Sequence, residues 1–127
     1  KFLNGTLNIP ALEAARPGLR IMNEVGVERI RAKSKRQTAR LIELANQHGW
    51  RVNTPRDPER RGGTVSIDMP DAPEVCRELL KRDILVDYRP KAGVRFSPHF
   101  YNTDQEIETA IGAVEEILKE RHAEAVR

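Results

Sequence analysis

The stretch that decides the fold lies near the end of the chain, where residues 94–107 read VRFSPHFYNTDQEI. Apolar Val94 and Phe96 alternate with polar Arg95 and Ser97, which is typical of a strand with one buried face. Successive side chains of a strand point to opposite faces. We therefore expect Arg95 to project from the face of the sheet that does not carry the core.

The same stretch predicts the start of a long last helix. Thr103 and Glu106 have the spacing of a capping box, in which each side chain bonds the backbone N–H of the other residue. Apolar residues then recur at the spacing of one helix face. They are Ile107, Ala110, Ile111, Val114, Ile117 and Leu118. We expect this face to pack against the buried side of the strand.

A hairpin is predicted directly before this helix. Residues 84–88 read as a strand, residues 90–92 as a turn, and residues 93–97 as the second strand of the pair. The short turn predicts that the two strands are antiparallel neighbours.

One more strand and one more helix precede the hairpin. Residues 64–69 alternate polar and apolar side chains, as a half-buried strand does. Asp71 and Glu74 repeat the capping-box spacing, and apolar residues at helical intervals continue to about Arg82. The sequence therefore predicts a strand that leads into a capped, half-buried helix.

The first half of the chain reads as helical. From Val27 the apolar residues fall on one side of a helical wheel, and Gly49 suits the end of that helix. Residues 10–16 and 17–24 each begin with a proline, which favours a helix start, so we predict two short leading helices. Residues 53–63, rich in Pro, Arg and Gly, read as a loop.

The order of these elements, α, β, α, β, β, α, predicts an α+β domain. Its sheet should hold three to four mostly antiparallel strands, with helices packed on one face. The other face, to which Arg95 points, must be solvated or covered by something outside these elements.

Composition indicates a soluble protein of a reducing compartment. The 127 residues carry a net charge of +3, which barely favours nucleic acid over any other partner. No apolar run approaches the roughly 20 residues that span a bilayer, and Cys76 is the single cysteine. The first residues also lack a secretory signal. We expect a cytoplasmic location, no membrane and no nucleic acid, and, since the chain starts at Lys1, part of a longer protein.

Cys76 and the three histidines suggest no chemistry of their own. Cys76 falls on the apolar stripe of a helix, which favours a core residue over a nucleophile. His48, His99 and His122 have no metal-ligand spacing to one another, so we expect no metal site.

Basic residues gather on the long helix. Arg29, Lys33, Arg36 and Arg40 form one stripe opposite the apolar side, which is typical of a solvated helix face. No aromatic residues that could stack on bases lie around them. Arg31 falls within the apolar sector instead, so it either pairs with a buried acid or contacts another domain.

Two loop segments allow two readings each. Residues 60–63 (RRGG) could hold an anion through backbone N–H groups, or could serve as a flexible entry to the next strand. Asn102 and Thr103 are most simply turn and N-cap residues, and direct contact with a ligand is the alternative.

Several segments together resemble one enzyme family. Residues 94–107 resemble the closing motif of class V aminotransferases and cysteine desulfurases, in which an arginine-bearing strand runs into a "YNT" turn and a last helix. Residues 60–66 and 83–90 resemble an arginine–glycine segment and a strand of kynureninases. Residues 2–10 resemble the "GTP" segment that follows the cofactor-lysine region, with Leu7 where proline is usual. The likeness covers essentially the whole chain.

This resemblance implies that residues 1–127 are the C-terminal small domain of a fold-type I enzyme that uses pyridoxal phosphate (PLP). Residues 1–26 would lead in from a large domain. Arg95 matches the arginine that binds the substrate α-carboxylate, and Thr6 matches a threonine that reaches the cofactor phosphate of the neighbouring subunit. The Schiff-base lysine would lie upstream of Lys1, so no catalytic residue is expected within the chain. The implied partners are the large domain, the second subunit of a homodimer and an amino-acid substrate.

Two functions from different classes remain open. In one, the intact protein is a kynureninase-like hydrolase or a class V aminotransferase, with cleavage at the β-carbon preferred over transamination or desulfuration. In the other, the chain is a free-standing α+β binding or regulatory module whose open sheet face meets a partner protein. The closing motif favours the first.

Overall fold

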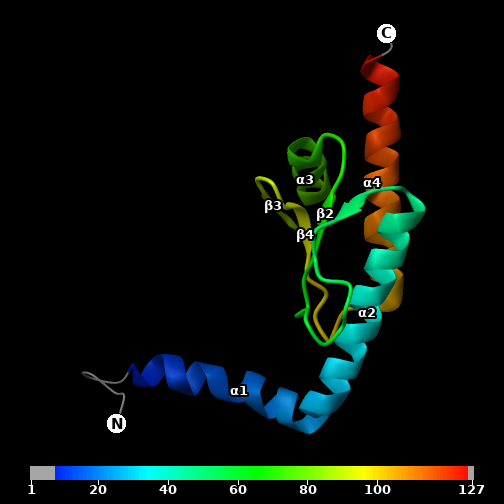
Figure 1. Ribbon diagram of the computed structural model, residues 1–127. Coiled ribbons are helices and arrows are strands. Elements are labelled where there is room, and N and C mark those ends of the chain that lie inside the picture. Colours follow the sequence, from blue (N-terminus) through cyan, green and yellow to red (C-terminus); the bar gives the residue numbers. More distant parts are fainter. Residues whose placement is uncertain (1–7, 126–127) are drawn as a thin grey trace. The chain divides into compact units, whose positions relative to one another are not determined.

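Four helices and four strands follow one another in the computed structural model, which describes residues 8–125 (Figure 1). They are α1 (Ile9–Val25), α2 (Val27–Gln47), β1 (Arg51–Val52), β2 (Val65–Asp68), α3 (Ala72–Lys81), β3 (Asp87–Arg89), β4 (Gly93–Phe96) and α4 (Asp104–Ala125). The chain forms two compact units, and the boundary between them falls within α2, after Ala32. No helix in the described range is long and apolar enough to cross a membrane.

In the first unit, α1 is one helix where the sequence predicted two. The Oδ1 atom of Asn8 caps it by accepting a hydrogen bond from the backbone N–H of Ala11 at 3.2 Å. The helix then continues through Pro17 to Gly26, where φ is 89°. The prediction of a break at Pro17 is therefore wrong. A proline inside a helix removes one N–H donor, but the alanines and arginine before it favour the helical state.

None of the described residues of α1 is buried. Five of its large apolar side chains are exposed: Ile9, Leu12, Leu19, Ile21 and Met22. A helix of this kind gains little stability from packing within its own unit, because most helical stability in proteins comes from burying an apolar face.

In the second unit, the four strands form one antiparallel sheet in the order β1-β2-β4-β3. The predicted α+β class and antiparallel sheet are confirmed. Strand β1 was missed, since two residues are too few to show a period. It pairs Arg51 with Asp68 and Val52 with Ile67.

Strand β3 starts at Asp87, later than the predicted start at residue 84. Residues 83 and 84 follow α3 directly and form its C-terminal cap. Asp83 has a φ of 59°, and the N–H of Ile84 bonds the carbonyl of Leu79 at 2.9 Å. The N–H of Asp83 bonds the carbonyl of Leu80 at 3.2 Å, which completes a Schellman motif. The cap of α3 therefore includes residue 84, at which the predicted strand began.

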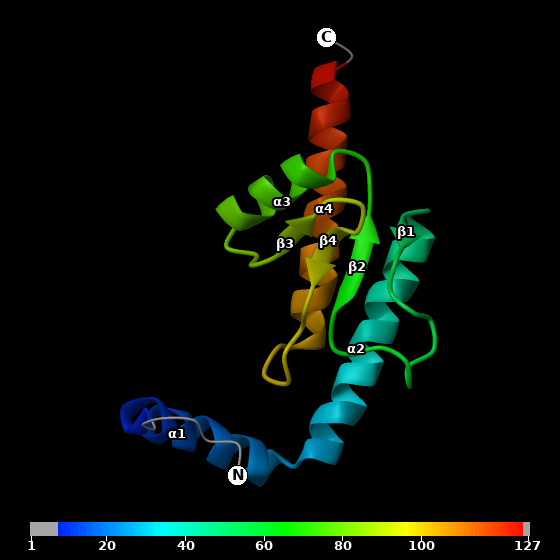
Figure 2. The same ribbon diagram turned by 60° about the vertical axis from the view of Figure 1, so that its left-hand side comes forward.

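The core lies between one face of the sheet and the helices. Val65 and Ile67 of β2 and Val94 and Phe96 of β4 are buried. Helices α2 and α4 run along this side of the sheet, and α3 packs against α4 and β4 (Figures 1 and 2). Their contributions to the same core include Leu41, Ala45, Val75, Leu79, Ile111, Val114 and Ile117. The predicted arrangement of helices on one face is confirmed.

The capping box predicted at the start of α3 is wrong. Asp71 has a left-handed backbone, with φ at 52°, and its side chain makes no cap hydrogen bond. Its carboxylate instead accepts a bond from Nε of Arg121 on α4, at 2.9 Å. N-cap residues normally have an extended backbone that turns the side chain over the first helical N–H groups. The ion pair with α4 takes the place of that local bond.

The capping box at the start of α4 is confirmed. The hydroxyl of Thr103 accepts from the N–H of Glu106 at 3.2 Å, and Oε2 of Glu106 accepts from the N–H of Thr103 at 2.5 Å. The donated backbone N–H of Thr103, together with its hydroxyl, holds the pKa of Glu106 below its usual value. Two of the four N–H groups that a helix start leaves without an intrahelical partner are thereby satisfied.

Replacing Thr103 with alanine should lower the free energy of unfolding by about 1 kcal/mol, because one N–H of α4 loses its acceptor. Thr109→Ala is the matched control, since Thr109 is exposed on the same helix. It should raise stability slightly, because alanine has the higher helix propensity. Urea unfolding followed by circular dichroism measures both, and equal effects of the two changes would contradict the capping role.

Candidate functional site

The candidate site is built on the hairpin of β3 and β4. A turn of three residues joins the strands, with the N–H of Ala92 bonded to the carbonyl of Arg89 at 3.0 Å. Lys91 and Gly93 both have positive φ, at 66° and 94°. The register pairs Asp87 with Arg95. The hairpin thus places one acid and one arginine directly opposite each other.

Arg95 projects from the open face of the sheet. Its neighbours along the strand, Val94 and Phe96, are 0% and 4% exposed, whereas the Arg95 side chain is 37% exposed. In register it lies between Ser66 of β2 and Asp87 of β3. The alternation predicted for this strand is confirmed. Because β4 is an interior strand of the sheet, Arg95 has a rigid base.

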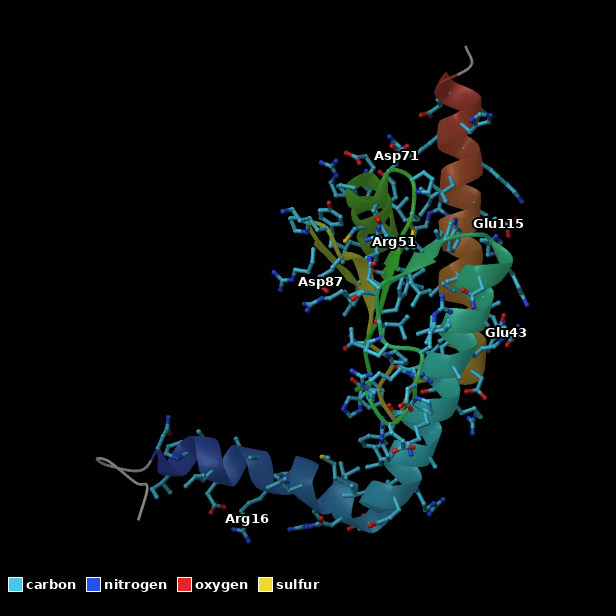
Figure 3. All side chains as sticks on the ribbon, viewed as in Figure 1. Arg16, Glu43, Arg51, Asp71, Asp87 and Glu115 are labelled. Atoms are coloured by element: carbon cyan, nitrogen blue, oxygen red, sulfur yellow. The ribbon has the colours of Figure 1, made fainter. Side chains whose placement is uncertain are left out.

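The guanidinium of Arg95 is held by the carboxylate of Asp87. Nε of Arg95 donates to Oδ1 at 2.8 Å, and Nη2 donates to Oδ2 at 2.5 Å. Nε of Arg89 lies 3.0 Å from the same Oδ2 atom. These two arginines, Arg95 foremost, hold the pKa of Asp87 below its usual value. Figure 3 shows Asp87 on the side of the sheet away from α2 and α4.

Sequence reasoning did not single out Asp87. The signal was present, because a turn at residues 90–92 fixes the register of the two strands and places residue 87 opposite residue 95. With one carboxylate between two guanidinium groups, the local formal charge is +1. The cluster of Arg89, Asp87 and Arg95 can therefore attract an anion to the open face, and Arg95 can bind a carboxylate through hydrogen bonds.

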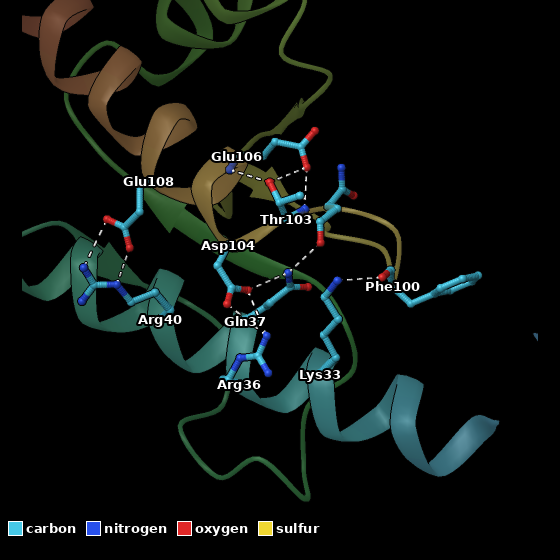
Figure 4. A network of polar contacts seen from close by, with 10 residues as sticks. Lys33, Arg36, Gln37, Arg40, Phe100, Thr103, Asp104, Glu106 and Glu108 are labelled. Carbon is cyan, nitrogen blue, oxygen red and sulfur yellow. Dashed lines mark hydrogen bonds and ion pairs between the residues drawn. The ribbon is translucent and has the colours of Figure 1, made fainter. Parts of the chain in front are cut away.

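The loop after β4 is anchored to α2. Nζ of Lys33 donates to the carbonyl of Phe100 at 2.8 Å, and Nε2 of Gln37 donates to the carbonyl of Asn102 at 3.0 Å (Figure 4). Oδ1 of Asn102 accepts from the N–H of His99 at 2.9 Å. Asn102 is thus a turn residue, and Thr103 is an N-cap residue. This loop carries the sequence signature of the closing motif and keeps a defined path directly after Arg95.

The basic stripe on α2 is solvated only in part: the Arg36 side chain is 62% exposed, but two of the arginines also pair with acids of α4. Arg36 pairs with Asp104 at 3.0 Å, and Arg40 pairs with Glu108 at 2.5 Å (Figure 4). The two arginines are four residues apart on α2, and the two acids are four residues apart on α4. The two ion pairs therefore lie one helical turn apart along the helices. The sequence did not predict these ion pairs, because the wheel of α2 alone does not show that α4 brings acids to its side.

Arg61 is buried, with 7% of its surface exposed. Its Nε donates to Oγ1 of Thr38 at 3.0 Å, and its Nη1 donates to the carbonyl of Arg56 at 2.5 Å. The side chain therefore joins the loop at residues 53–63 to α2. Sequence reasoning missed this role, because a long-range contact of one arginine leaves no periodic signal.

The other candidate residues lie in surroundings that indicate structural roles. Cys76 is buried, as expected of a core residue, and burial raises the pKa of its thiol. His48 stacks on Trp50, and His99 stacks on Tyr101. His122 is exposed in the last turn of α4, Arg31 is half-buried, and Thr6 lies outside the described residues. Within residues 8–125 no group of three His, Cys, Asp or Glu side chains is placed to hold a metal ion.

Comparisons of the sequence with known proteins point to one family. Residues 30–114 match the family model described as the kynureninase C-terminal domain. The chain is 32% identical over 124 residues to a kynureninase of Shouchella clausii (strain KSM-K16), covering 94% of this chain and 29% of that relative. It is 29% identical over 122 residues to a kynureninase of Geobacillus thermodenitrificans (strain NG80-2), covering 92% and 28%. The chain therefore spans less than a third of the length of these relatives.

A solved structure has the same fold. The apo cysteine desulfurase from Thermococcus onnurineus NA1 superposes with a TM-score of 0.82 at 26% identity, over 93% of this chain and 33% of that one. The fold is thus that of the small domain of PLP enzymes. With the family model matching well over half of its residues, the chain belongs to the kynureninase C-terminal domain family.

Proposed function

We propose that this chain is the C-terminal domain of a PLP-dependent hydrolase that cleaves an amino acid at its β-carbon, as a kynureninase does. The observation that carries the proposal is the match of residues 30–114 to the kynureninase C-terminal domain. The antiparallel sheet with one open face supports it, because that face offers polar side chains on rigid strands to the rest of an enzyme.

In this proposal Arg95 binds the α-carboxylate of the substrate. A planar guanidinium can hold a carboxylate through two parallel hydrogen bonds, which a lysine cannot do. Two such bonds fix the rotation of the substrate about its Cα atom as well as its position. Arg95 is suited to this task because its strand is interior to the sheet and its guanidinium is already aligned by Asp87.

The described residues fit the substrate side of a PLP site. Arg95 presents hydrogen-bond donors on an open sheet face that the helices packed on the core side of the second unit do not cover. When bound, PLP supplies the electron sink that stabilises negative charge developing at the substrate Cα atom. Arg95 holds and orients the substrate there. The proposal places the lysine that carries PLP upstream of Lys1 and assigns a cofactor-phosphate contact to Thr6.

The proposed partners are a large domain in the same chain and a second subunit of a homodimer. Two surfaces support this. The described part of α1 exposes its apolar side chains, and apolar surface of this kind marks protein contacts. The sheet carries charged residues on its open face, where a second domain would complete a ligand site. A cytoplasmic enzyme of this kind is also part of the proposal.

The test is turnover of L-kynurenine, the compound after which kynureninases are named, by the full-length protein loaded with PLP. Cleavage of the bond between the β- and γ-carbons leaves a three-carbon amino acid, so L-alanine should appear at the rate at which the substrate disappears. Formation of a 2-oxo acid in place of alanine would assign the protein to the aminotransferases. Sulfide release from L-cysteine, with no conversion of kynurenine, would assign it to the desulfurases.

A further inference from the structure

We propose that Asp87 is a positioning residue, which orients the guanidinium of Arg95 so that its outer pair of N–H groups faces the substrate. This inference rests on the proposed function, because it takes Arg95 as the group that binds the carboxylate. Asp87 itself touches neither substrate nor cofactor in this proposal.

The hydrogen bonds between the two side chains are made along one edge of the guanidinium. Asp87 takes the N–H of Nε and one N–H of Nη2, through its two oxygens at 2.8 and 2.5 Å. A guanidinium has five N–H donors in one plane. Three of them, two on Nη1 and one on Nη2, stay available, and the Nη1 and Nη2 pair forms a second two-pronged edge. Within the described residues Arg95 has no acceptor other than Asp87.

The carboxylate of Asp87 is itself fixed. Strand pairing places it opposite Arg95, and Nε of Arg89 lies 3.0 Å from Oδ2. The hydrogen bond from Arg95 is the first cause of its lowered pKa, so the carboxylate stays charged further into the acidic range than an ordinary aspartate. Asp87 therefore meets a guanidinium on two sides, and its place in the strand sets which edge of the Arg95 guanidinium it can bond.

The geometry also lets Asp87 support Arg95 without competing with a substrate for the same N–H groups. If Asp87 occupied the Nη1 and Nη2 edge, a substrate carboxylate would have to displace it. Because Asp87 uses the Nε and Nη2 edge, a second carboxylate can bind the outer edge while the first stays in place. A substrate then meets an arginine whose torsions are already ordered, so less entropy is lost on binding.

The experiment uses the full-length enzyme loaded with PLP, and compares Asp87→Asn with the wild type. Asparagine keeps the size of the side chain and removes the charge. The readout is the Kd for L-alaninamide divided by the Kd for L-alanine. The two ligands differ only at the carboxylate, and the absorbance of bound PLP reports their binding. The ratio should fall about three- to tenfold, the factor expected when one long side chain is no longer ordered in advance. KM for L-kynurenine should rise by a similar factor, with kcat changed less than twofold.

Asp68→Asn is the matched control. Asp68 lies on the same face of the sheet, two residues beyond Ser66, which is the register partner of Arg95. Asp68→Asn removes the same charge without touching Arg95. The Kd ratio should stay within twofold of the wild-type value. Asp87→Glu keeps the charge and should recover part of the selectivity, and this second variant serves if Asp87→Asn does not fold.

A double-mutant cycle separates positioning from a general effect on the fold. In an Arg95→Ala background, Asp87→Asn should add less than a twofold change in the Kd ratio. An equal effect in both backgrounds, an effect no larger than that of Asp68→Asn, or tighter carboxylate binding in Asp87→Asn would overturn the inference. An unchanged ratio in Arg95→Ala alone would refute the carboxylate role of Arg95 in the proposed function, and with it the basis for Asp87.

Discussion

Arg95→Ala in the full-length enzyme should lower kcat/KM by about tenfold to a hundredfold, because a hydrogen bond to a charged group contributes roughly 1.5 to 3 kcal/mol. The fold and the PLP content should stay intact, since Arg95 lies on the open face and the core residues Val94 and Phe96 are unchanged. Asp87 would lose one of its two arginine partners and keep Arg89, and because it is 43% exposed it can also be solvated. Steady-state kinetics and the absorbance of bound PLP measure the two outcomes.

Two further variants test whether the loss of activity is specific to the guanidinium of Arg95. Arg95→Lys should recover only part of the activity, because one ammonium keeps the charge but not the two-pronged geometry. Arg51→Ala removes an exposed arginine of β1 whose Nε bonds Oδ1 of Asn53, and should change kcat/KM by less than about twofold. Near-wild-type kinetics for Arg95→Ala, or an equal loss in Arg51→Ala, would refute the assignment.

Gly93→Ala should lower the free energy of unfolding by about 3 kcal/mol or more. A Cβ atom at this position would lie 2.2 Å from the carbonyl oxygen of Ile67 and 2.7 Å from Cα of Asp68. Both are backbone atoms of β2, so no side chain can rotate away. The φ of 94° adds strain for any residue with a Cβ atom. Strand β4 must move away from β2, and Arg95 moves with it.

Gly112→Ala is the matched control for this change. Gly112 lies within α4, and a Cβ atom there would meet nothing within 4 Å. Alanine should raise stability by about 0.5 to 1 kcal/mol, because it is the better helix former. Urea unfolding followed by circular dichroism measures both variants. A Gly93→Ala protein within 1 kcal/mol of the wild type would mean that β2 and β4 do not approach each other as described.

Local patterns in the sequence determined much of the second unit. The alternation of Val94, Arg95 and Phe96 predicted which side chains are buried, because neighbouring residues of a strand point to opposite faces. The capping box of Thr103 and Glu106 formed as predicted, since both bonds join groups within one turn. Such patterns are reliable where the interacting groups are close in the chain.

The two capping-box patterns show that spacing along the chain does not by itself decide whether the box forms. Asp71 and Glu74 have the same spacing as Thr103 and Glu106, yet only the second pair forms the box. Asp71 bonds Arg121 instead, fifty positions along the chain. Folding brings a charged partner from α4 to Asp71, and nothing in the residues around Asp71 signals that partner.

In the candidate site, too, the sequence determined some features and only the tertiary structure decided the others. The sequence alone determined that Arg95 leaves the core face, and the hairpin register could have placed Asp87 opposite it. The tertiary structure decided that the arginines of α2 face the acids of α4 and that Arg61 is buried against Thr38. The physical reason is that strand and helix periods follow from bonds between near neighbours. Ion pairs between elements depend on which surfaces come together only when the whole core packs.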